Sequence, residues 1–213
     1  MNDLIKWHRA AIGEKVVSAL TKNNFTASFV ETREAATAKL LELIPADATI
    51  GFGGSVTLGE LGIIDKLEER GNNVLNYLKP GLSPQEVRAI RRQHLLADIY
   101  LSGTNAVTLD GKLVNVDATG NRVGAMLFGP DKVFIVVGVN KIVKDVAEAE
   151  NRVKIWASPP NNKRLGYPNP CAQTGICVDC QGPTRICNIT TIVHKKPRLT
   201  DVHVIVVGED LGL

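Results

Sequence analysis

The chain has 213 residues, which is enough for a single well-packed domain or for one domain with a small appendage. Its 25 lysine and arginine residues nearly balance 22 aspartate and glutamate residues, and aromatic residues make up only 5% of the chain. This balance of charge and scarcity of aromatic rings argue against a nucleic-acid-binding protein and against attachment to an anionic membrane surface.

The amino-terminal stretch does not resemble a targeting signal. It mixes charged residues into its apolar positions and therefore lacks the apolar core of a signal peptide. No apolar run in the chain approaches the roughly 20 residues that are needed to cross a bilayer. We therefore expect a cytoplasmic protein, in which clustered cysteines more often bind metal or do redox chemistry than form lasting disulfides.

The first half of the chain alternates between helical and strand patterns. Apolar residues at helical spacing predict helices over 4–20, 32–44 and 57–70, and shorter apolar runs predict strands over 25–30, 48–55 and 73–77. A further helix over 83–98 has a clear start, with Ser83 as N-cap, Pro84 as first helical residue and Glu86 closing a capping box. On that helix His94 joins three arginines in a basic stripe, which we expect to face solvent.

The second half of the chain continues the alternation of helices and strands until its composition changes after residue 156. The patterns predict a strand over 98–103, a hairpin over 105–118 that turns at Asp110 and Gly111, a buried strand over 132–139, a helix over 145–155 and a last strand over 202–209. Residues 157–200 are rich in Pro, Gly and Asn and are expected to be irregular. The chain is therefore predicted to be one α/β domain over 1–213. It would have an open, mostly parallel sheet with helices on both faces, an inserted β-hairpin and a cysteine-rich C-terminal loop.

A glycine-rich turn, GFGGSVTLGELG (51–62), connects the second predicted strand to a helix. A helix N-terminus favours a phosphate or carboxylate; Gly53 and Gly54 would let the backbone approach it, and the hydroxyls of Ser55 and Thr57 could donate to it. The third glycine of the dinucleotide fingerprint and the Gly-Lys-Ser/Thr of the P-loop are both missing. The alternative is a tight turn whose Ser or Thr only caps the helix.

Polar residues also follow two other predicted strands, at the edge where an open α/β sheet binds ligands. They are Asp117, Asn121, Arg122, Asn140 and Lys141. Asp117 is a candidate acid or base and Lys141 a candidate proton-transfer group, while Arg122 could hold a carboxylate or phosphate with its fork of donors. The alternative for Asp117 and Arg122 is an ion pair that fixes a loop.

All the cysteines of the chain lie in one short segment with the spacing C-x5-C-x2-C-x6-C. They are Cys171, Cys177, Cys180 and Cys187. The central pair can bind one ion from a tight turn, and four thiolates suit either structural zinc or a [4Fe–4S] cluster. The spacing itself selects neither, and the cysteines could also be free or disulfide-forming, with Cys187 a buried apolar residue.

The strings GFGGSVTLGELG, DGKLVNVDATGNRV and GPDKVFIVVGVNKIV resemble those of the LUD-domain, or lactate-utilisation, family over residues 4–207. The resemblance implies a fold like that of ribose-phosphate isomerases, glucosamine-phosphate deaminases and CoA transferases. It implies phosphate binding at Gly53, Gly54, Ser55 and Thr57, and it puts the five polar strand-end residues in the family's own motifs. Because the family includes a component of bacterial iron–sulfur lactate-oxidising systems, the resemblance favours a [4Fe–4S] cluster over zinc.

Three functions follow as hypotheses. The first is an accessory or electron-transfer component in the oxidation of lactate or a related small hydroxy acid, with iron–sulfur or oxidoreductase subunits as partners and a small anionic metabolite as ligand. The second is a free-standing enzyme that acts on a phosphorylated sugar or an acyl substrate. The third is a protein braced by zinc without catalysis. A homodimer is possible in each case, and neither nucleic acid nor membrane is an expected partner.

Overall fold

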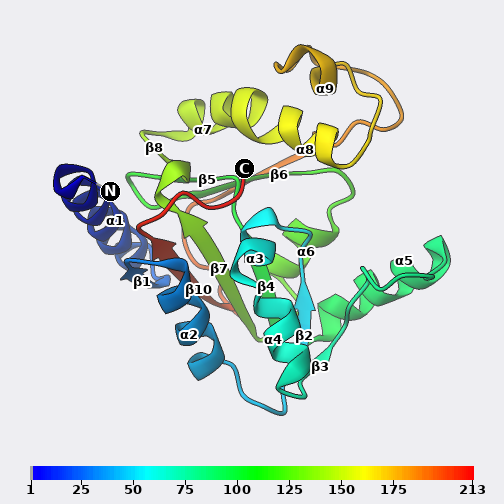
Figure 1. Cartoon of the computed structure of the whole chain (residues 1–213), viewed down its shortest axis with the longest axis horizontal. Coiled ribbons are helices and arrows are strands. Elements are labelled where there is room, and N and C mark those ends of the chain that lie inside the picture. The colour runs from blue at the N-terminus through cyan, green and yellow to red at the C-terminus, as the bar shows by residue number, and fades with distance from the viewer. Residues whose placement is uncertain (1) are drawn as a thin grey trace.

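The computed structural model describes residues 2–213, so that Met1 lies outside the described residues. In this part of the chain the central sheet has the strand order β1-β10-β7-β4-β2-β3, and every neighbouring pair is parallel (Figure 1). Its strands are β1 (Thr26–Val30), β2 (Thr49–Phe52), β3 (Asn73–Val74), β4 (Ile99–Gly103), β7 (Lys132–Gly138) and β10 (Asp201–Val207). The predicted α/β class with an open parallel sheet is confirmed.

Helices cover both faces of this sheet. On one face α2 (Arg33–Leu43), α3 (Val56–Leu61) and α4 (Ile63–Glu69) pack on the side chains of Phe52, Leu101 and Phe134. On the other face α1 (Asp3–Lys22) and α6 (Asn121–Leu127) pack on Tyr100 and Val133. The alternation of side chains along each strand divides the apolar core into these two layers.

The predicted helix over 57–70 is two helices in the structure. α3 ends and α4 begins at Gly62, whose backbone φ of 60° lies in the left-handed region. Glycine enters this region without the steric cost that other residues meet, so it ends one helix and redirects the chain into the next.

The predicted hairpin over 105–118 belongs to a second, smaller sheet. Its strands β5 (Ala106–Thr108) and β6 (Leu113–Asp117) are flanked by β8 (Ile142–Val143) and β9 (Ile189–Val193), in the order β8-β5-β6-β9 among the described residues. β9 lies within 157–200, where no regular structure was expected. Its sequence, ITTIV, is rich in β-branched residues and pairs antiparallel with β6.

Residues 157–200 also contain helices, against expectation. α7 (Val146–Arg152) continues through a π-helical segment, η3 (Val153–Ala157), into α8 (Ser158–Arg164), and α9 (Cys171–Thr174) follows. Pro159 and Pro160 lie in the first turn of α8, directly after η3, and the Ser158 N–H that precedes them donates to Val153 O. Figure 1 shows this part of the chain above the small sheet.

The prediction for His94 was wrong. α5 (Pro84–Gln93) has the predicted capping box but ends at Gln93, and a 3-10 turn, η1 (His94–Leu96), follows. The tighter turn rotates His94 away from the exposed stripe into the core, where only 1% of the residue is exposed. No helix within residues 2–213 is both long and apolar enough to cross a membrane.

Candidate functional site

A hydrogen bond between Lys141 and Thr57 lies at the edge of the sheet where β2 and β7 end. Lys141 belongs to the 3-10 turn η2 (Val139–Lys141) after β7, and its Nζ donates to Thr57 Oγ1 over 2.9 Å. The two residues are 4% and 1% exposed. Burial, and then the nearby cation of Arg152, lower the pKa of Lys141 to about 7, although Glu60 opposes this change.

Glycines bring backbone close to this pair. A side chain on Gly103, at the end of β4, would lie 2.8 Å from Ser55 Oγ, and one on Gly212 would overlap Thr57 Oγ1 and lie 3.0 Å from Lys141 Nζ. Ser55 is the N-cap of α3, and its Oγ accepts from the backbone N–H of Leu58 at 3.4 Å. Ser55, Thr57 and Lys141, all predicted site residues, are therefore gathered in one place.

Arg122 is half-buried beside this group, and its terminal N–H donors are not free for a ligand. Its Nη1 donates to Gly103 O and Asn115 Oδ1 at 3.3 and 2.8 Å, and its Nη2 donates to Asn105 Oδ1 and Val116 O at 3.1 and 2.9 Å. All four acceptors are neutral. Burial lowers the pKa of the guanidinium, and the nearby Asp117 carboxylate opposes this.

Asp117 fixes the start of α6 in this structure. Its Oδ1 accepts from the N–H of Ala118 at 2.9 Å and its Oδ2 accepts from the N–H of Val123 at 3.1 Å. Among residues 2–213 it forms no ion pair with Arg122, so the expected alternative of a direct Asp–Arg pair is not what holds the loop. Its role as an acid or base stays a prediction. Asn121, the first residue of α6, accepts a hydrogen bond from the Thr119 hydroxyl at the surface.

The space beside Gly53 and Gly54 is occupied by side chains of the protein itself. A side chain on Gly53 would lie 3.0 Å from Arg122 Cδ and 3.2 Å from the Tyr100 hydroxyl, and one on Gly54 would lie 2.8 Å from the Tyr77 hydroxyl. These glycines therefore admit an arginine and two phenol groups to the turn. The sequence offered no signal for this convergence, because Tyr77, in the turn after β3, and Tyr100, in β4, are far apart in the chain and have the pattern of ordinary core residues.

An aromatic cluster of Phe52, Tyr77, His94 and Tyr100 carries polar atoms that lack partners. The Nε2 of His94 lies 2.9 Å from the Leu75 carbonyl and must donate to it, so Nδ1 is left as an acceptor in the neutral ring that burial favours by lowering the pKa. Neither this Nδ1 nor the Tyr100 hydroxyl has a hydrogen-bond partner within residues 2–213. Burial raises the pKa of the Tyr100 hydroxyl above its ordinary value.

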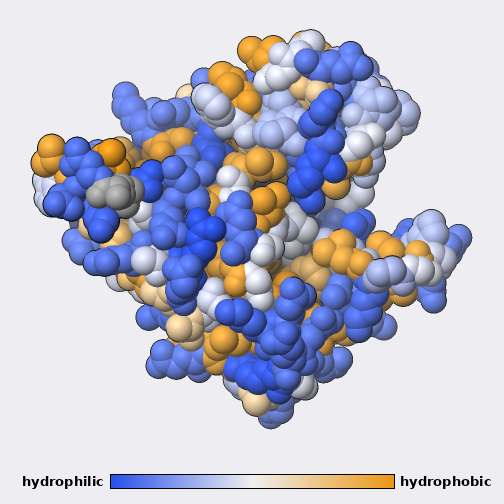
Figure 2. Space-filling model, in the orientation of Figure 1, coloured by the Kyte–Doolittle hydropathy of each residue, from blue (hydrophilic) through white to orange (hydrophobic). Residues whose placement is uncertain are grey.

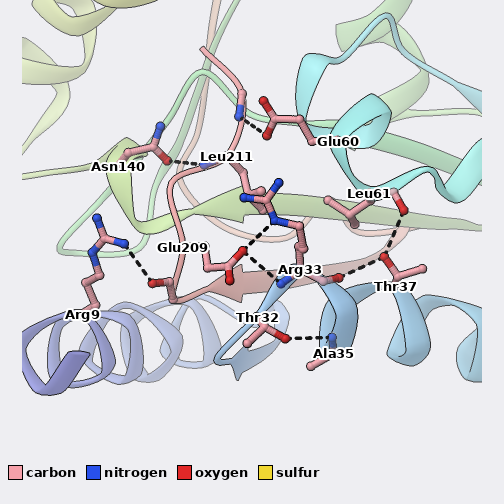
Figure 3. A network of polar contacts seen from close by, with 12 residues as sticks. Arg9, Thr32, Arg33, Ala35, Thr37, Glu60, Leu61, Asn140, Glu209 and Leu211 are labelled. Carbon is pink, nitrogen blue, oxygen red and sulfur yellow. Dashed lines mark hydrogen bonds and ion pairs between the residues drawn. The ribbon is translucent and has the colours of Figure 1, made fainter. Parts of the chain in front are cut away.

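The last residues of the chain, 208–213, form a tail that lies across the Lys141–Thr57 pair. The tail is held by contacts from four sides: Arg9 to Asp210 at 2.8 Å, Arg33 to Glu209 at 2.8 Å, Asn140 Oδ1 to the Leu211 N–H at 3.1 Å, and Glu60 to the Gly212 N–H at 2.9 Å (Figure 3). Asn140, a predicted anion-binding residue, thus holds the tail. Figure 1 shows the tail passing between α7 and α3.

Arg152, on α7, is a second buried cation near this edge of the sheet. Its Nε donates to Asn140 O at 3.2 Å, and its Nη1 donates to Asn105 O and Leu213 O at 2.8 and 3.3 Å. Burial lowers its pKa to about 10. In the described chain neither Arg122, Lys141 nor Arg152 forms an ion pair with an acidic side chain. Uncompensated buried charges are costly, and a bound anion would compensate them.

The four cysteines lie in the segment that contains α9 and follows α8, at the top of Figure 1. This segment comes after Arg122, Lys141 and Arg152 in the sequence. Figure 2 shows a notch between this part and α5. Cys171 is buried, and its Sγ accepts from Asn162 Nδ2 at 3.2 Å, while the Cys187 thiol donates to Ser158 Oγ at 3.1 Å. Burial raises the pKa of the Cys171 thiol, and the three other cysteines raise it further.

This arrangement of thiols does not yet form a ligand set. Across residues 2–213, no three Cys, His, Asp or Glu side chains are placed so that they could hold a metal ion. The four cysteines form no disulfide among the described residues. A metal ion or cluster would therefore require the segment 171–187 to rearrange.

Comparison with known proteins agrees with the fold. The model of the LUD domain family matches residues 13–207. A DUF162 family protein from Deinococcus radiodurans has a similar structure, with 19% sequence identity, a TM-score of 0.53 and coverage of 93% of this chain and 98% of that chain. A ribose 5-phosphate isomerase from Plasmodium falciparum matches with 18% identity, a TM-score of 0.34 and coverage of 53% of this chain and 52% of its own. No curated protein matches the chain.

Proposed function

Because this chain belongs to the LUD-domain, or lactate-utilisation, family, we propose that it binds the carboxylate of lactate or a related small hydroxy acid. The observation that carries the proposal is a group of three cations that form no ion pair with an acidic side chain in the described chain, near the carboxyl ends of the parallel strands. Lys141 and Arg152 are buried and Arg122 is half-buried. The protein would act as an accessory or electron-transfer component in oxidation of that acid, together with iron–sulfur or oxidoreductase subunits.

Lys141, Thr57 and Ser55 are the residues that we expect to touch the carboxylate. The Lys141 ammonium has three N–H donors, of which one is used by Thr57, and the Thr57 hydroxyl accepts that bond and keeps its own hydrogen for a ligand. Arg122 contributes its charge rather than its fork, because its terminal donors are already committed to neutral acceptors. Since Gly212 lies against Thr57 and Lys141, the ligand reaches this pair when the tail shifts.

Ligand-dependent stabilisation tests this proposal. Thermal denaturation would be followed with L-lactate, D-lactate and pyruvate, and with ribose 5-phosphate as the competing ligand. A ligand at about a hundred times its Kd stabilises the folded state by roughly 2.7 kcal/mol. We expect at least one hydroxy acid to do so in the wild-type protein, and the effect to be lost in Lys141→Met.

Lys79→Met is the matched control, because Lys79 is 60% exposed and pairs only weakly with Glu68 at 3.8 Å. It should respond to ligand as the wild type does. Equal stabilisation of Lys141→Met and wild type, or no response to any hydroxy acid, would contradict the proposal. A response to ribose 5-phosphate alone would favour the sugar-phosphate enzyme in its place.

We further propose that the four cysteines bind a [4Fe–4S] cluster, with zinc as the alternative. The support is the chemistry of the donor set, four free thiols within the 17 residues from Cys171 to Cys187. Protein prepared without oxygen should be brown and contain iron and sulfide, and Cys180→Ser should lose both. Colourless protein with one equivalent of zinc would indicate a structural brace, and metal-free protein would end the proposal.

A further inference from the structure

A cavity of about 550 Å³ lies beside the tail, on the side of α7 and η3. This volume is within the range of sites that bind small molecules. Gly212 lines the cavity and also contacts Thr57 and Lys141, so the tail forms the wall between the cavity and the carboxylate site proposed above. The cavity is therefore a separate place for a ligand.

Arg152 gives this cavity a buried positive charge with a donor to spare. The residue is 8% exposed and lines the cavity, and its Nε and Nη1 donate to main-chain oxygens of Asn140, Asn105 and Leu213. Its Nη2 has no hydrogen-bond partner within residues 2–213, and it is not among the polar atoms sealed from solvent. Nη2 is thus the donor that Arg152 can direct to an anionic group in the cavity.

Trp156 gives the same cavity an aromatic wall. It follows Arg152 by four residues along the helical segment, it lines the cavity, and 68% of its surface is exposed. An exposed indole next to a partly committed guanidinium suits a flat ring that stacks on one and places a negative charge at the other. Apolar side chains of Ile142, Val143 and Pro160 complete the lining around the ring position.

Glu148 indicates which substituent the ring of the ligand should carry. Its Oε2 accepts from the Lys144 N–H at 2.6 Å, and its Oε1 has no partner among the residues that the structure describes. Because Glu148 also lines the cavity, it would accept from an amino group on a ring and repel a second negative charge. Arg152, Trp156 and Glu148 together favour a ligand that has one anionic group and an aromatic ring with an amino substituent.

We propose that the cavity binds an amino-substituted heteroaromatic ligand that carries one phosphate, as an adenine mononucleotide does. The ring stacks on Trp156, the ring amino group faces Glu148 and the phosphate binds Arg152 Nη2. Arg152 and the tail also border the proposed carboxylate site, but the two proposals are tested with different ligands, so that AMP binding without hydroxy-acid binding, or the reverse, tells which of them fails.

Titration with AMP, adenosine and inorganic phosphate tests the site, with Kd values from calorimetry. Trp7 and Trp156 are the two tryptophans of the chain and are both 68% exposed, so Trp7→Ala is a matched control for Trp156→Ala. AMP should bind the wild type and Trp7→Ala equally and should bind Trp156→Ala at least about tenfold more weakly. Adenosine and phosphate should each bind more weakly than AMP.

A second readout does not depend on the stability of a cavity variant. In Trp7→Phe the remaining indole is Trp156, and AMP should quench its fluorescence to saturation at the Kd that calorimetry gives. Absence of saturable AMP binding to the wild type would overturn the inference. Equal affinity of Trp156→Ala and Trp7→Ala, or equal affinity for adenosine and AMP, would also overturn it.

Discussion

Lys141 makes the stability of the protein depend on pH. Its pKa falls from an ordinary value of 10.5 to about 7 on folding, so between these values the folded protein binds fewer protons than the unfolded chain. Its stability must then rise with pH, by at most about 1.4 kcal/mol per pH unit for this group. Below pH 7 the amine is protonated in both states and the full cost of burying its charge is present.

Lys141→Met should therefore be more stable than the wild type at pH 6 and should lose part of the rise in stability between pH 7 and 9.5. Urea denaturation across this range measures both effects. Lys79→Met, at an exposed position, should keep the slope of the wild type. Parallel profiles for Lys141→Met and wild type would show that the amine is not strongly perturbed.

The Tyr100 hydroxyl is a second single group that should lower the free energy of unfolding measurably. It has no partner within residues 2–213 although the residue is fully buried. Tyr100→Phe removes an unsatisfied polar group and keeps the ring, so it should raise the free energy of unfolding of the ligand-free protein by about 1 kcal/mol. Chemical denaturation, with Tyr77→Phe for comparison, provides the measurement. A clear loss of stability would mean that the hydroxyl is satisfied in solution.

At the scale of elements, the hairpin turn between β5 and β6 packs on α1 through Gly111. This glycine has a φ of 80°, and a side chain on it would lie 2.6 to 2.8 Å from the backbone of Ala19 and Leu20. Gly111→Ala should therefore destabilise the protein by about 3 kcal/mol or more, since it adds a backbone clash to the strain of a positive φ.

Gly71→Ala is the control for that prediction. Gly71 has a φ of 92° but open space around it, so the substitution should cost only about 1 kcal/mol of backbone strain. Equal losses of thermal stability for the two variants would show that the hairpin can move away from α1.

The elements that could be predicted from the sequence are those with a strong local signal. The capping box at Ser83, the turn at Asp110 and Gly111 and the β-branched run of β7 each depend on neighbouring residues, and each was found. β9 and α8 were missed because Pro, Gly and Asn dominate the composition around them, while tertiary packing determines their structure.

The candidate site could be predicted in part for the same reason. Ser55, Thr57 and Lys141 follow strands whose carboxyl ends share one edge of the sheet, so their proximity follows from the fold class. Other features of the site depend on contacts between segments that are distant in the sequence. They are the hydrogen bonds of Arg122 to neutral acceptors, the unpartnered hydroxyl of Tyr100 and the burial of Arg152. No periodicity or spacing in the chain encodes those contacts.

At the scale of the whole molecule, the tail connects both helical layers to the proposed carboxylate site. Glu209 accepts from the side chain and the backbone N–H of Arg33 on α2, at 2.8 and 3.4 Å, whereas the more exposed Asp210 accepts from the side chain of Arg9 on α1. Glu209→Gln should therefore speed amide hydrogen exchange at Leu211 and Gly212 several-fold, and Asp210→Asn should have a smaller effect. The reverse order, measured by mass spectrometry, would place the main anchor at Arg9.

The π-helical segment η3 determines how α8 is rotated relative to α7 around their common helix axis. A π turn holds one residue more than an α turn, and each residue of a helix turns it by about 100°. Arg152 and Asn162, the partner of Cys171, lie on opposite sides of η3, and the Cys177 N–H donates to Lys154 O within it. Deleting a single residue from Val153–Ala157 would thus rotate α8 and the cysteine segment 171–187 by about 100° around the helix axis, while Arg152 would keep its position.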